Sequence, residues 1–135
     1  MREMPDHQKL ADWLAPLDQL ALECDGLTRV VSALLTRDGI EHQAHLGTLE
    51  TPQGRIDLHC WVELPDGTVC DFRARMRLGE DAPHGIFHPD NSICYESLGA
   101  LKRIDLNNSE IFQFIFGIDL DSYPSFLIAP GIRPA

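Results

Sequence analysis

The side chains best suited to covalent chemistry are Cys24, His59 and Asp71, which supply a thiol, an imidazole and a carboxylate. A cysteine thiolate can attack a carbonyl carbon, a histidine can carry the proton, and an acid can fix the tautomer of the histidine. Cys24 comes just before the apolar stripe of an expected helix, where unpaired N–H groups and the helix dipole favour the thiolate. This combination predicts nucleophilic chemistry at a thiol.

Two alternating segments predict a β-hairpin that carries the histidine and the acid. Residues 55–64 and 69–76 each alternate between apolar and polar types, and Pro65-Asp66-Gly67 separates them. His59 lies on the polar face of the first segment. The opposite, core-facing side is predicted to hold Ile56, Leu58, Cys60, Val62 and Leu64.

The length of the loop decides whether His59 and Asp71 share a face of the hairpin. A three-residue loop, with its glycine in the left-handed conformation, pairs Leu64 with Thr68. Trp61 then faces Asp71, and His59 becomes the diagonal neighbour of Asp71, within side-chain reach. A two-residue loop would place the two side chains on opposite faces, so the prediction depends on this turn.

Helical segments are expected before the hairpin. Residues 8–21 have apolar side chains at helical spacing, and Pro16 should kink this segment or divide it into two short helices. A second apolar stripe covers residues 27–35, and Asp25 is its expected N-cap. Cys24 would then lie at the helix start or one residue before it.

The remaining elements complete an α+β fold in which N-terminal helices pack on an antiparallel sheet. We expect a single domain over residues 1–135, because the chain is too short for two ordinary domains. Two further strands are predicted, over residues 40–49 and 123–128, and a long, partly ordered excursion is expected over 79–108. A helix capped by Ser109 is predicted over 110–116, and it should bury Ile111, Phe112 and Ile115.

These pieces resemble the transglutaminase-like branch of the papain-fold cysteine enzymes, as a small bacterial member. The resemblance covers roughly residues 20–75, and its order is a cysteine at a helix start, a Gly-Ile opening a strand, H-x-W, D-G and an aspartate. The matching segments are Cys24-Asp25-Gly26-Leu27, Gly39-Ile40, His59-Cys60-Trp61-Val62-Glu63, Asp66-Gly67 and Asp71. The resemblance implies a papain-like core with Cys24 as nucleophile, His59 as base and Asp71 as the orienting acid.

The activity implied is acyl transfer on a protein or peptide-like amide, without a cofactor. A thioester at Cys24 would be resolved by water, as in a peptidase, amidase or deamidase, or by an amine, as in a transferase. The backbone N–H of Cys24 is the expected first oxyanion donor. One alternative is a catalytically silent papain-fold protein that binds a protein partner through the same groove, and another is an acidic mimic of nucleic acid that occupies a basic protein.

Four further residues are candidates for the surroundings of the site, each with a structural alternative. Gln19 can donate to an oxyanion from its amide or be a solvated helix residue. Trp61 can cover the site or make a plain cross-strand contact. Arg73, expected on the face of Asp71, can recognise an acidic substrate group or pair with nearby carboxylates. His84 can line the rim of a pocket.

Metal binding is not the favoured interpretation of the remaining cysteines and histidines. Cys60 and Cys70 fall on the apolar face and are predicted to be core residues, on the other side of the sheet from His59, which excludes a zinc site that joins them. Cys94 has no assigned role. A metal pair of His84 with His88 is the weaker alternative to a pocket rim.

Charge and cysteine usage exclude several classes of function. Eleven Lys and Arg against 21 Asp and Glu give a formal charge of −10, so neither a basic footprint for nucleic acid nor attraction to an anionic membrane is expected. The N-terminus lacks the apolar core of a signal peptide, and no C-x-x-C pair occurs. We therefore expect reduced thiols in a cytoplasmic protein.

Overall fold

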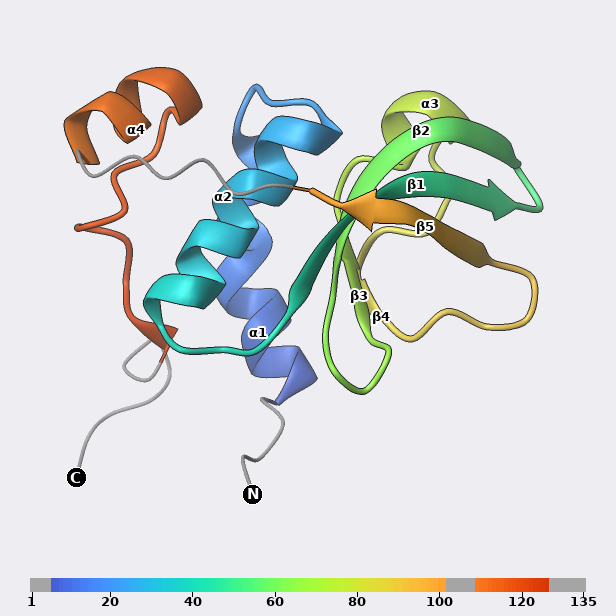
Figure 1. Ribbon diagram of the computed structural model, residues 1–135, viewed down its shortest axis with the longest axis horizontal. Coiled ribbons are helices and arrows are strands. Elements are labelled where there is room, and N and C mark those ends of the chain that lie inside the picture. Colours follow the sequence, from blue (N-terminus) through green and yellow to red (C-terminus); the bar gives the residue numbers. More distant parts are fainter. Residues whose placement is uncertain (1–5, 102–108, 127–135) are drawn as a thin grey trace.

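The computed structural model describes residues 6–101 and 109–126, which form helices packed against an open, five-stranded antiparallel sheet (Figure 1). The predicted α+β class is confirmed. The strand order is β4-β3-β2-β1-β5. Among the described residues, no helix combines the length and apolar character needed to cross a bilayer. The elements are α1 (His7–Leu14), η1 (Ala15–Gln19), α2 (Cys24–Arg37), β1 (Gln43–Thr51), β2 (Gly54–Glu63), β3 (Val69–Asp71), α3 (Arg75–Leu78), β4 (Gly85–Phe87), β5 (Cys94–Ala100) and α4 (Ser109–Phe116).

The N-terminal helices divide as the sequence predicts. Pro16 lies in the first turn of η1, so α1 ends and a tighter 3₁₀ turn follows. The predicted N-cap of α2 is wrong: the extended backbone of Glu23 precedes the helix, and Asp25 lies inside the first turn. There Asp25 forms an ion pair with Arg29 at 3.3 Å, four residues further on.

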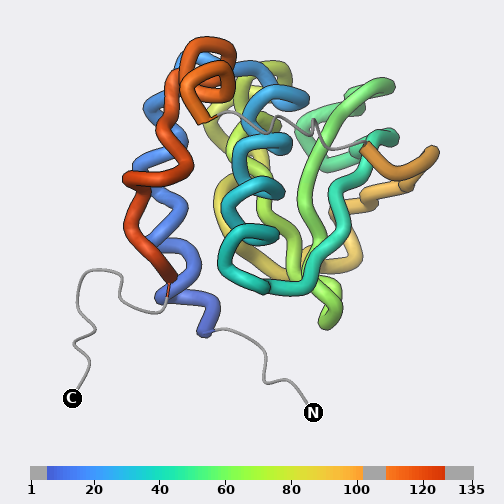
Figure 2. Tube along the Cα trace, turned by 60° about the vertical axis from the view of Figure 1, so that its left-hand side comes forward, coloured from blue at the N-terminus to red at the C-terminus, as the bar shows by residue number. Residues whose placement is uncertain are grey.

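The main core lies between the helices and one face of the sheet (Figure 2). The helices α1 and α2 lie side by side on this face, and their apolar stripes meet the core-facing side chains of β2 and β3. Burying such stripes is the main source of stability for short amphipathic helices. The buried members include Leu10, Trp13, Leu14, Leu17, Leu27, Val30, Val31, Leu34, Leu35, Val62, Leu64 and Cys70.

The hairpin between β2 and β3 has the predicted register. Val62 pairs with Cys70, and the Leu64 N–H donates to the Thr68 carbonyl at 2.8 Å. Gly67 has a φ of 89°, the left-handed conformation that a three-residue loop requires. The loop therefore places His59 and Asp71 on one face.

A bulge in β2 breaks the predicted alternation. Gly47 of β1 pairs with His59, but two residues later Leu49 pairs with Ile56, so β2 has one extra residue in this interval. Leu58, predicted to face the core, is instead 63% exposed. Ile56 packs with Leu49 in a second, smaller core cluster on the same side of the sheet as His59.

The second strand of the hairpin is shorter than predicted. It ends at Asp71, and residues 75–78 form the short helix α3 instead of continuing the strand to 76. The Asp71 carboxylate accepts a hydrogen bond from the Arg73 N–H at 3.0 Å. Such a side-chain turn competes with strand pairing, so the chain leaves the sheet directly after Asp71.

The segment 79–108 contains more regular structure than its composition suggests. Both edge strands, β4 and β5, come from it, and β5 pairs with β1. Nearly every residue of β5 is exposed, because it forms an edge of the sheet, and this explains why no apolar period reveals it. Residues 102–108 lie outside the described part of the chain.

The C-terminal predictions are partly wrong. The helix α4 occupies the expected residues, but it buries Phe112 and Phe116, while Ile111 and Ile115 are about half exposed. The expected last strand over 123–128 is not formed at residues 123–126, and 127–128 are outside the described residues. Phe126 is instead buried against the indole ring of Trp13, with the ring centroids 5.3 Å apart.

Candidate active site

His59 and Asp71 form a buried hydrogen-bonded pair. Nε2 of His59 lies 2.7 Å from Oδ2 of Asp71, and the two residues are 1% and 3% exposed. The contact is the diagonal one that the hairpin register predicts. A carboxylate in this position fixes the tautomer and the orientation of the imidazole.

The carboxylate of Asp71 has two further hydrogen-bond donors. The hydroxyl of Tyr95, on β5, donates to Oδ2 at 2.8 Å, and the Arg73 N–H binds Oδ1. Burial and the negative charge of Asp71 raise the pKa of Tyr95, so its hydroxyl keeps the proton that it donates. Both carboxylate oxygens are therefore held in place.

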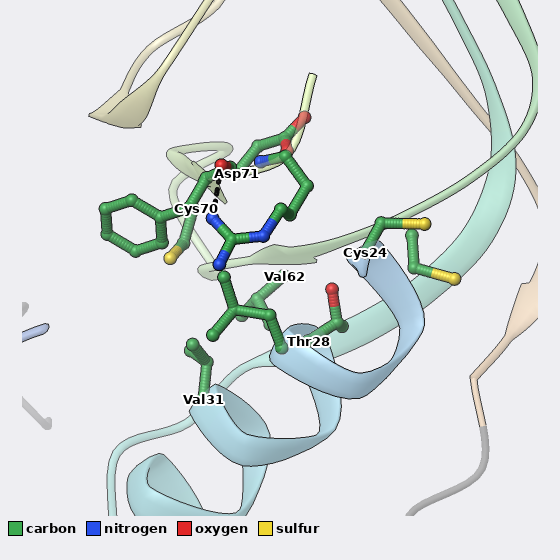
Figure 3. A pocket seen from close by; sticks show the side chains of 10 residues that line it. Cys24, Thr28, Val31, Val62, Cys70 and Asp71 are labelled. Carbon is green, nitrogen blue, oxygen red and sulfur yellow. Dashed lines mark hydrogen bonds between the residues drawn. The ribbon is translucent and has the colours of Figure 1, made fainter. Parts of the chain in front are cut away.

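Cys24 is the first residue of α2 and is half-buried at the start of this helix (Figure 3). The N-cap residue Glu23 makes no side-chain hydrogen bond to the first turn. The first N–H groups of a helix have no partner within the helix, so those of α2 can donate hydrogen bonds to a negative charge that develops beside the sulfur.

The thiol of Cys24 and the imidazole of His59 shift each other's pKa in the directions that favour a thiolate and an imidazolium. Hydrogen bonds from the Cys60 thiol, the His59 ring and the Cys60 N–H outweigh burial and lower the pKa of Cys24 to about 4. Burial opposes protonation of His59, but the hydrogen bonds to Asp71 and Cys24 raise its pKa to about 9. Because Nε2 of His59 is bound to Asp71, Nδ1 is the ring nitrogen available to Cys24.

Cys60 takes part in this arrangement, which the sequence analysis does not predict. Its burial, and that of Cys70, is confirmed, but it also lines the same small cavity as Cys24. The pairing of β2 with β3 ends at Val62 and Cys70, and α2 packs against β2, so that Cys24 and Cys60 line one cavity. The hydrogen bond to Cys24 raises the pKa of Cys60 far above that of an ordinary thiol.

A small cavity lies beside Cys24, between α2 and the hairpin. Thr28 and Val31 of α2 line one wall, and Val62 and Cys70 line the other (Figure 3). Its volume is about 10 Å³, enough for a single water molecule. Substrate would therefore have to reach Cys24 at the start of α2 and not through this cavity.

Trp61 covers His59 on the far side of the sheet from α2. The two rings are nearly parallel, with centroids 6.3 Å apart, and Trp61 also contacts His45 and Tyr95. It therefore packs over the site and also makes the cross-strand contact. The indole Nε1 is buried and has no hydrogen-bond partner among the described residues.

Arg73 and His84 hold the segment before α2 against the sheet. The Arg73 guanidinium donates to the carbonyls of Leu22 and Leu20 at 2.6 and 2.8 Å and to the Asp18 carboxylate. His84 Nε2 binds the other oxygen of Asp18 at 3.0 Å. Arg73 does not occupy the predicted strand position beside Asp71, because β3 has already ended.

The other candidates are not assembled at the site. Gln19 ends η1 with an exposed side chain, and no hydrogen bond among the described residues joins it to Cys24. His88 is exposed and lies against the Asp66 carbonyl at 3.2 Å, whereas His84 binds Asp18. In the described parts of the chain, no three His, Cys, Asp or Glu side chains gather where they could hold a metal ion.

Two contributors to the site, Tyr95 and Cys60, were missed by sequence reasoning. The only local signal for Tyr95 is the β-prone pattern of Ile93, Cys94 and Tyr95, and Cys60 is marked only by its place next to His59.

Comparison of the chain with models of protein families, with curated proteins and with solved structures found no match. The function must therefore be argued from the site.

Proposed function

We propose that this protein is a cysteine-dependent acyl-transfer enzyme with a papain-like, transglutaminase-type core. The observation that carries the proposal is the position of His59, which is bound through Nε2 to Asp71 and is near enough to Cys24, at the start of α2, that each shifts the pKa of the other. A thiolate and an imidazolium held together in this way form a nucleophile and an acid that are ready before substrate binds.

In the first half of the reaction, the Cys24 thiolate attacks the carbonyl carbon of a protein or peptide-like amide. The negative charge that develops on the carbonyl oxygen is stabilised by the N–H groups of the first turn of α2, which have no partner within the helix, the Cys24 N–H among them. His59 donates its proton from Nδ1 to the amide nitrogen, the C–N bond breaks and an amine leaves. A thioester at Cys24 and a neutral His59 remain.

In the second half, neutral His59 removes a proton from a water molecule or from an acceptor amine. The resulting nucleophile attacks the thioester carbon, the C–S bond breaks, and Cys24 returns as a thiolate beside the imidazolium. Water yields hydrolysis or deamidation, and an amine yields transamidation. Throughout, Asp71 holds the imidazole in place and stabilises its positive charge, and Tyr95 holds Asp71.

Labelling with electrophilic probes and measurement of intact mass test the proposal. Small activated esters and amides should acylate Cys24 at neutral pH, and hydroxylamine should release the acyl group. Cys24→Ala should abolish labelling, His59→Ala should slow it by about 100-fold or more, and Cys94→Ser, at an exposed thiol, should leave it unchanged. Equal labelling of Cys24 and Cys94, or no effect of His59→Ala, would rule the triad out.

The small volume of the cavity favours a second candidate, a catalytically silent protein that binds a protein partner over the same surface. A cavity of about 10 Å³ cannot hold a substrate side chain. In this case the Cys24 thiolate would still react with iodoacetamide, but no acyl group would pass from a peptide amide to water or to an amine. Turnover of a peptide library therefore separates the two candidates.

A further inference from the structure

Cys24 and Cys60 are neighbours in space, although they come from a helix and from a strand. Both residues line the small cavity between α2 and the hairpin, and the neighbouring Cys60 thiol is the foremost cause of the lowered pKa of Cys24. Cys24 is half-buried, whereas Cys60 is only 3% exposed. A small oxidant can therefore reach Cys24 first.

We propose that Cys24 and Cys60 form a reversible redox site, in which a peroxide converts the pair to a disulfide and a thiol reductant restores it. The inference goes beyond the acyl-transfer activity and does not depend on it, since it needs only two adjacent thiols. The disulfide removes the nucleophile, so the oxidised protein is inactive in acyl transfer.

The chemistry requires one two-electron oxidant, a hydroperoxide. The Cys24 thiolate attacks the terminal peroxide oxygen, the O–O bond breaks, and the leaving oxygen takes a proton and departs as water or an alcohol. Cys24 is then a sulfenic acid. The Cys60 sulfur attacks the Cys24 sulfur, the S–O bond breaks, and a second water leaves with the Cys60 proton. The two thiols together lose two electrons, and the peroxide gains them.

Cys60 can act as the resolving thiol because the group that suppresses its ionisation is Cys24 itself. The hydrogen bond to Cys24 is the foremost cause of the raised pKa of Cys60, with burial and the charge of Cys24 next. Oxidation of Cys24 to the neutral sulfenic acid removes this charge. Cys60 can then release its proton at the moment when its sulfur must attack.

The other two cysteines are less suited to this role. Cys70 lines the same cavity, but it is buried and its raised pKa results from burial and from the charge of Asp71, with no contribution from Cys24. Cys94 is exposed on the edge strand β5. These two residues serve as internal references in the test.

The experiment treats the full chain with a small excess of hydrogen peroxide and maps its cysteines by mass spectrometry. The expected product has lost two hydrogens, contains a peptide linked through Cys24 and Cys60, and returns to the starting mass with dithiothreitol. Iodoacetamide labelling of Cys24 should fall by about tenfold or more after oxidation and recover after reduction. Cys94→Ser should behave as wild type.

Cys60→Ser retains a hydroxyl donor to Cys24 but removes the resolving sulfur. It should stop the reaction at the sulfenic acid, which dimedone traps, and further peroxide should produce sulfinic acid at Cys24. Sulfinic acid at Cys24 of the wild-type protein with Cys60 still reduced would overturn the proposal. A link from Cys24 to Cys94, or between two chains, would also overturn it. The peptide map of the wild type decides the matter even if Cys60→Ser does not fold.

Discussion

The hydroxyl of Tyr95 donates to Oδ2 of Asp71 at 2.8 Å, although the two residues belong to strands that β1 and β2 separate in the sheet. The sheet is strongly curved, which brings its edge strand β5 towards the end of β3 (Figure 1). The Tyr95 ring reaches across Trp61, with the ring centroids 4.8 Å apart. An edge strand therefore helps to hold the carboxylate that binds His59.

Tyr95→Phe should impair the site more than the fold. The ring packing stays, but the Asp71 carboxylate loses one of its donors, so we expect a loss of about 1.5–3 kcal/mol in the free energy of unfolding. Acylation of Cys24 at neutral pH should slow by about three- to tenfold, because the carboxylate that holds His59 is less well fixed. Urea denaturation and probe labelling measure the two effects.

The matched control for Tyr95→Phe is the same change at Tyr123, the other tyrosine of the chain. Its hydroxyl donates to the carbonyl of Trp13, in the helical half of the molecule and away from Asp71. Tyr123→Phe should lower stability but leave the labelling rate of Cys24 unchanged. If both variants slow labelling equally, Tyr95 has no special role in positioning the acid.

The pKa values of Cys24 and His59 predict an unusual pH dependence of labelling. Because the pKa of Cys24 is lowered to about 4 and that of His59 raised to about 9, the thiolate–imidazolium pair exists between these two pH values. Iodoacetamide labelling of Cys24 should thus reach a plateau well below neutrality. A labelling curve that rises only near the ordinary thiol pKa of about 8.5 would contradict the ion pair.

The same two groups predict how stability changes with pH. From about pH 4 upwards the folded state binds one proton fewer at Cys24 than the unfolded state, whose thiol pKa is 9.0, so stability should rise. His59 has a pKa of 6.5 in the unfolded state and about 9 in the folded state. Between these pH values the folded state binds one proton more at His59 than the unfolded state, and this opposes the rise in stability that Cys24 causes. The contribution of the pair should therefore grow from pH 4 to 6.5 and level off up to pH 9. In Cys24→Ala, the rise below 6.5 should be smaller.

The pairing of His59 with Asp71 and the position of Cys24 at a helix start could be predicted from the sequence because short-range features determine them. The three-residue loop with its left-handed Gly67 sets the hairpin register, and the register brings His59 next to Asp71. The apolar stripe of α2 locates Cys24 at a helix start to within one residue. Each of these features depends on fewer than about fifteen consecutive residues.

The parts that could not be predicted depend on long-range pairing. Leu58 is exposed because of the bulge in the pairing of β1 with β2. The alternation of residue types within β2 does not reveal this bulge. Tyr95 reaches Asp71 only because of the curvature of the whole sheet. Cys60 lies near Cys24 because α2 packs against β2, two elements that are separate in the sequence.

Arg73 is predicted to stabilise the segment before α2 and not to bind substrate. The planar guanidinium of Arg73 donates hydrogen bonds to Asp18, Leu20 and Leu22 at the same time. The ammonium group of a lysine is a single point charge and cannot make this set of hydrogen bonds. Arg73→Lys should therefore cost about 3 kcal/mol in urea denaturation, whereas Arg75→Lys, at an exposed position, should change stability by less than about 0.5 kcal/mol. Unchanged stability with weakened binding of an acidic substrate would instead favour the recognition role.

Gly47 is predicted to be required for the approach of β5 to β1, and through it for the position of Tyr95. A Cβ at this position would lie 2.0 Å from the backbone carbonyl oxygen of Glu96, the residue that follows Tyr95, so β5 would have to move. Gly47→Ala should cost about 1–3 kcal/mol and slow Cys24 labelling at least as much as Tyr95→Phe.

The matched control for Gly47→Ala is Gly99→Ala on β5. A Cβ there would have no atom within 4 Å, and the backbone of Gly99 is not in the left-handed region. This variant should change stability by less than about 0.5 kcal/mol and leave labelling at the wild-type rate. If Gly47→Ala loses stability but labels Cys24 normally, β5 can shift without disturbing Asp71, and the link between the edge strand and the triad is refuted. If Gly47→Ala and Gly99→Ala slow the labelling of Cys24 equally, the slower labelling results from any disturbance of β5 and not from the contact of β5 with Gly47.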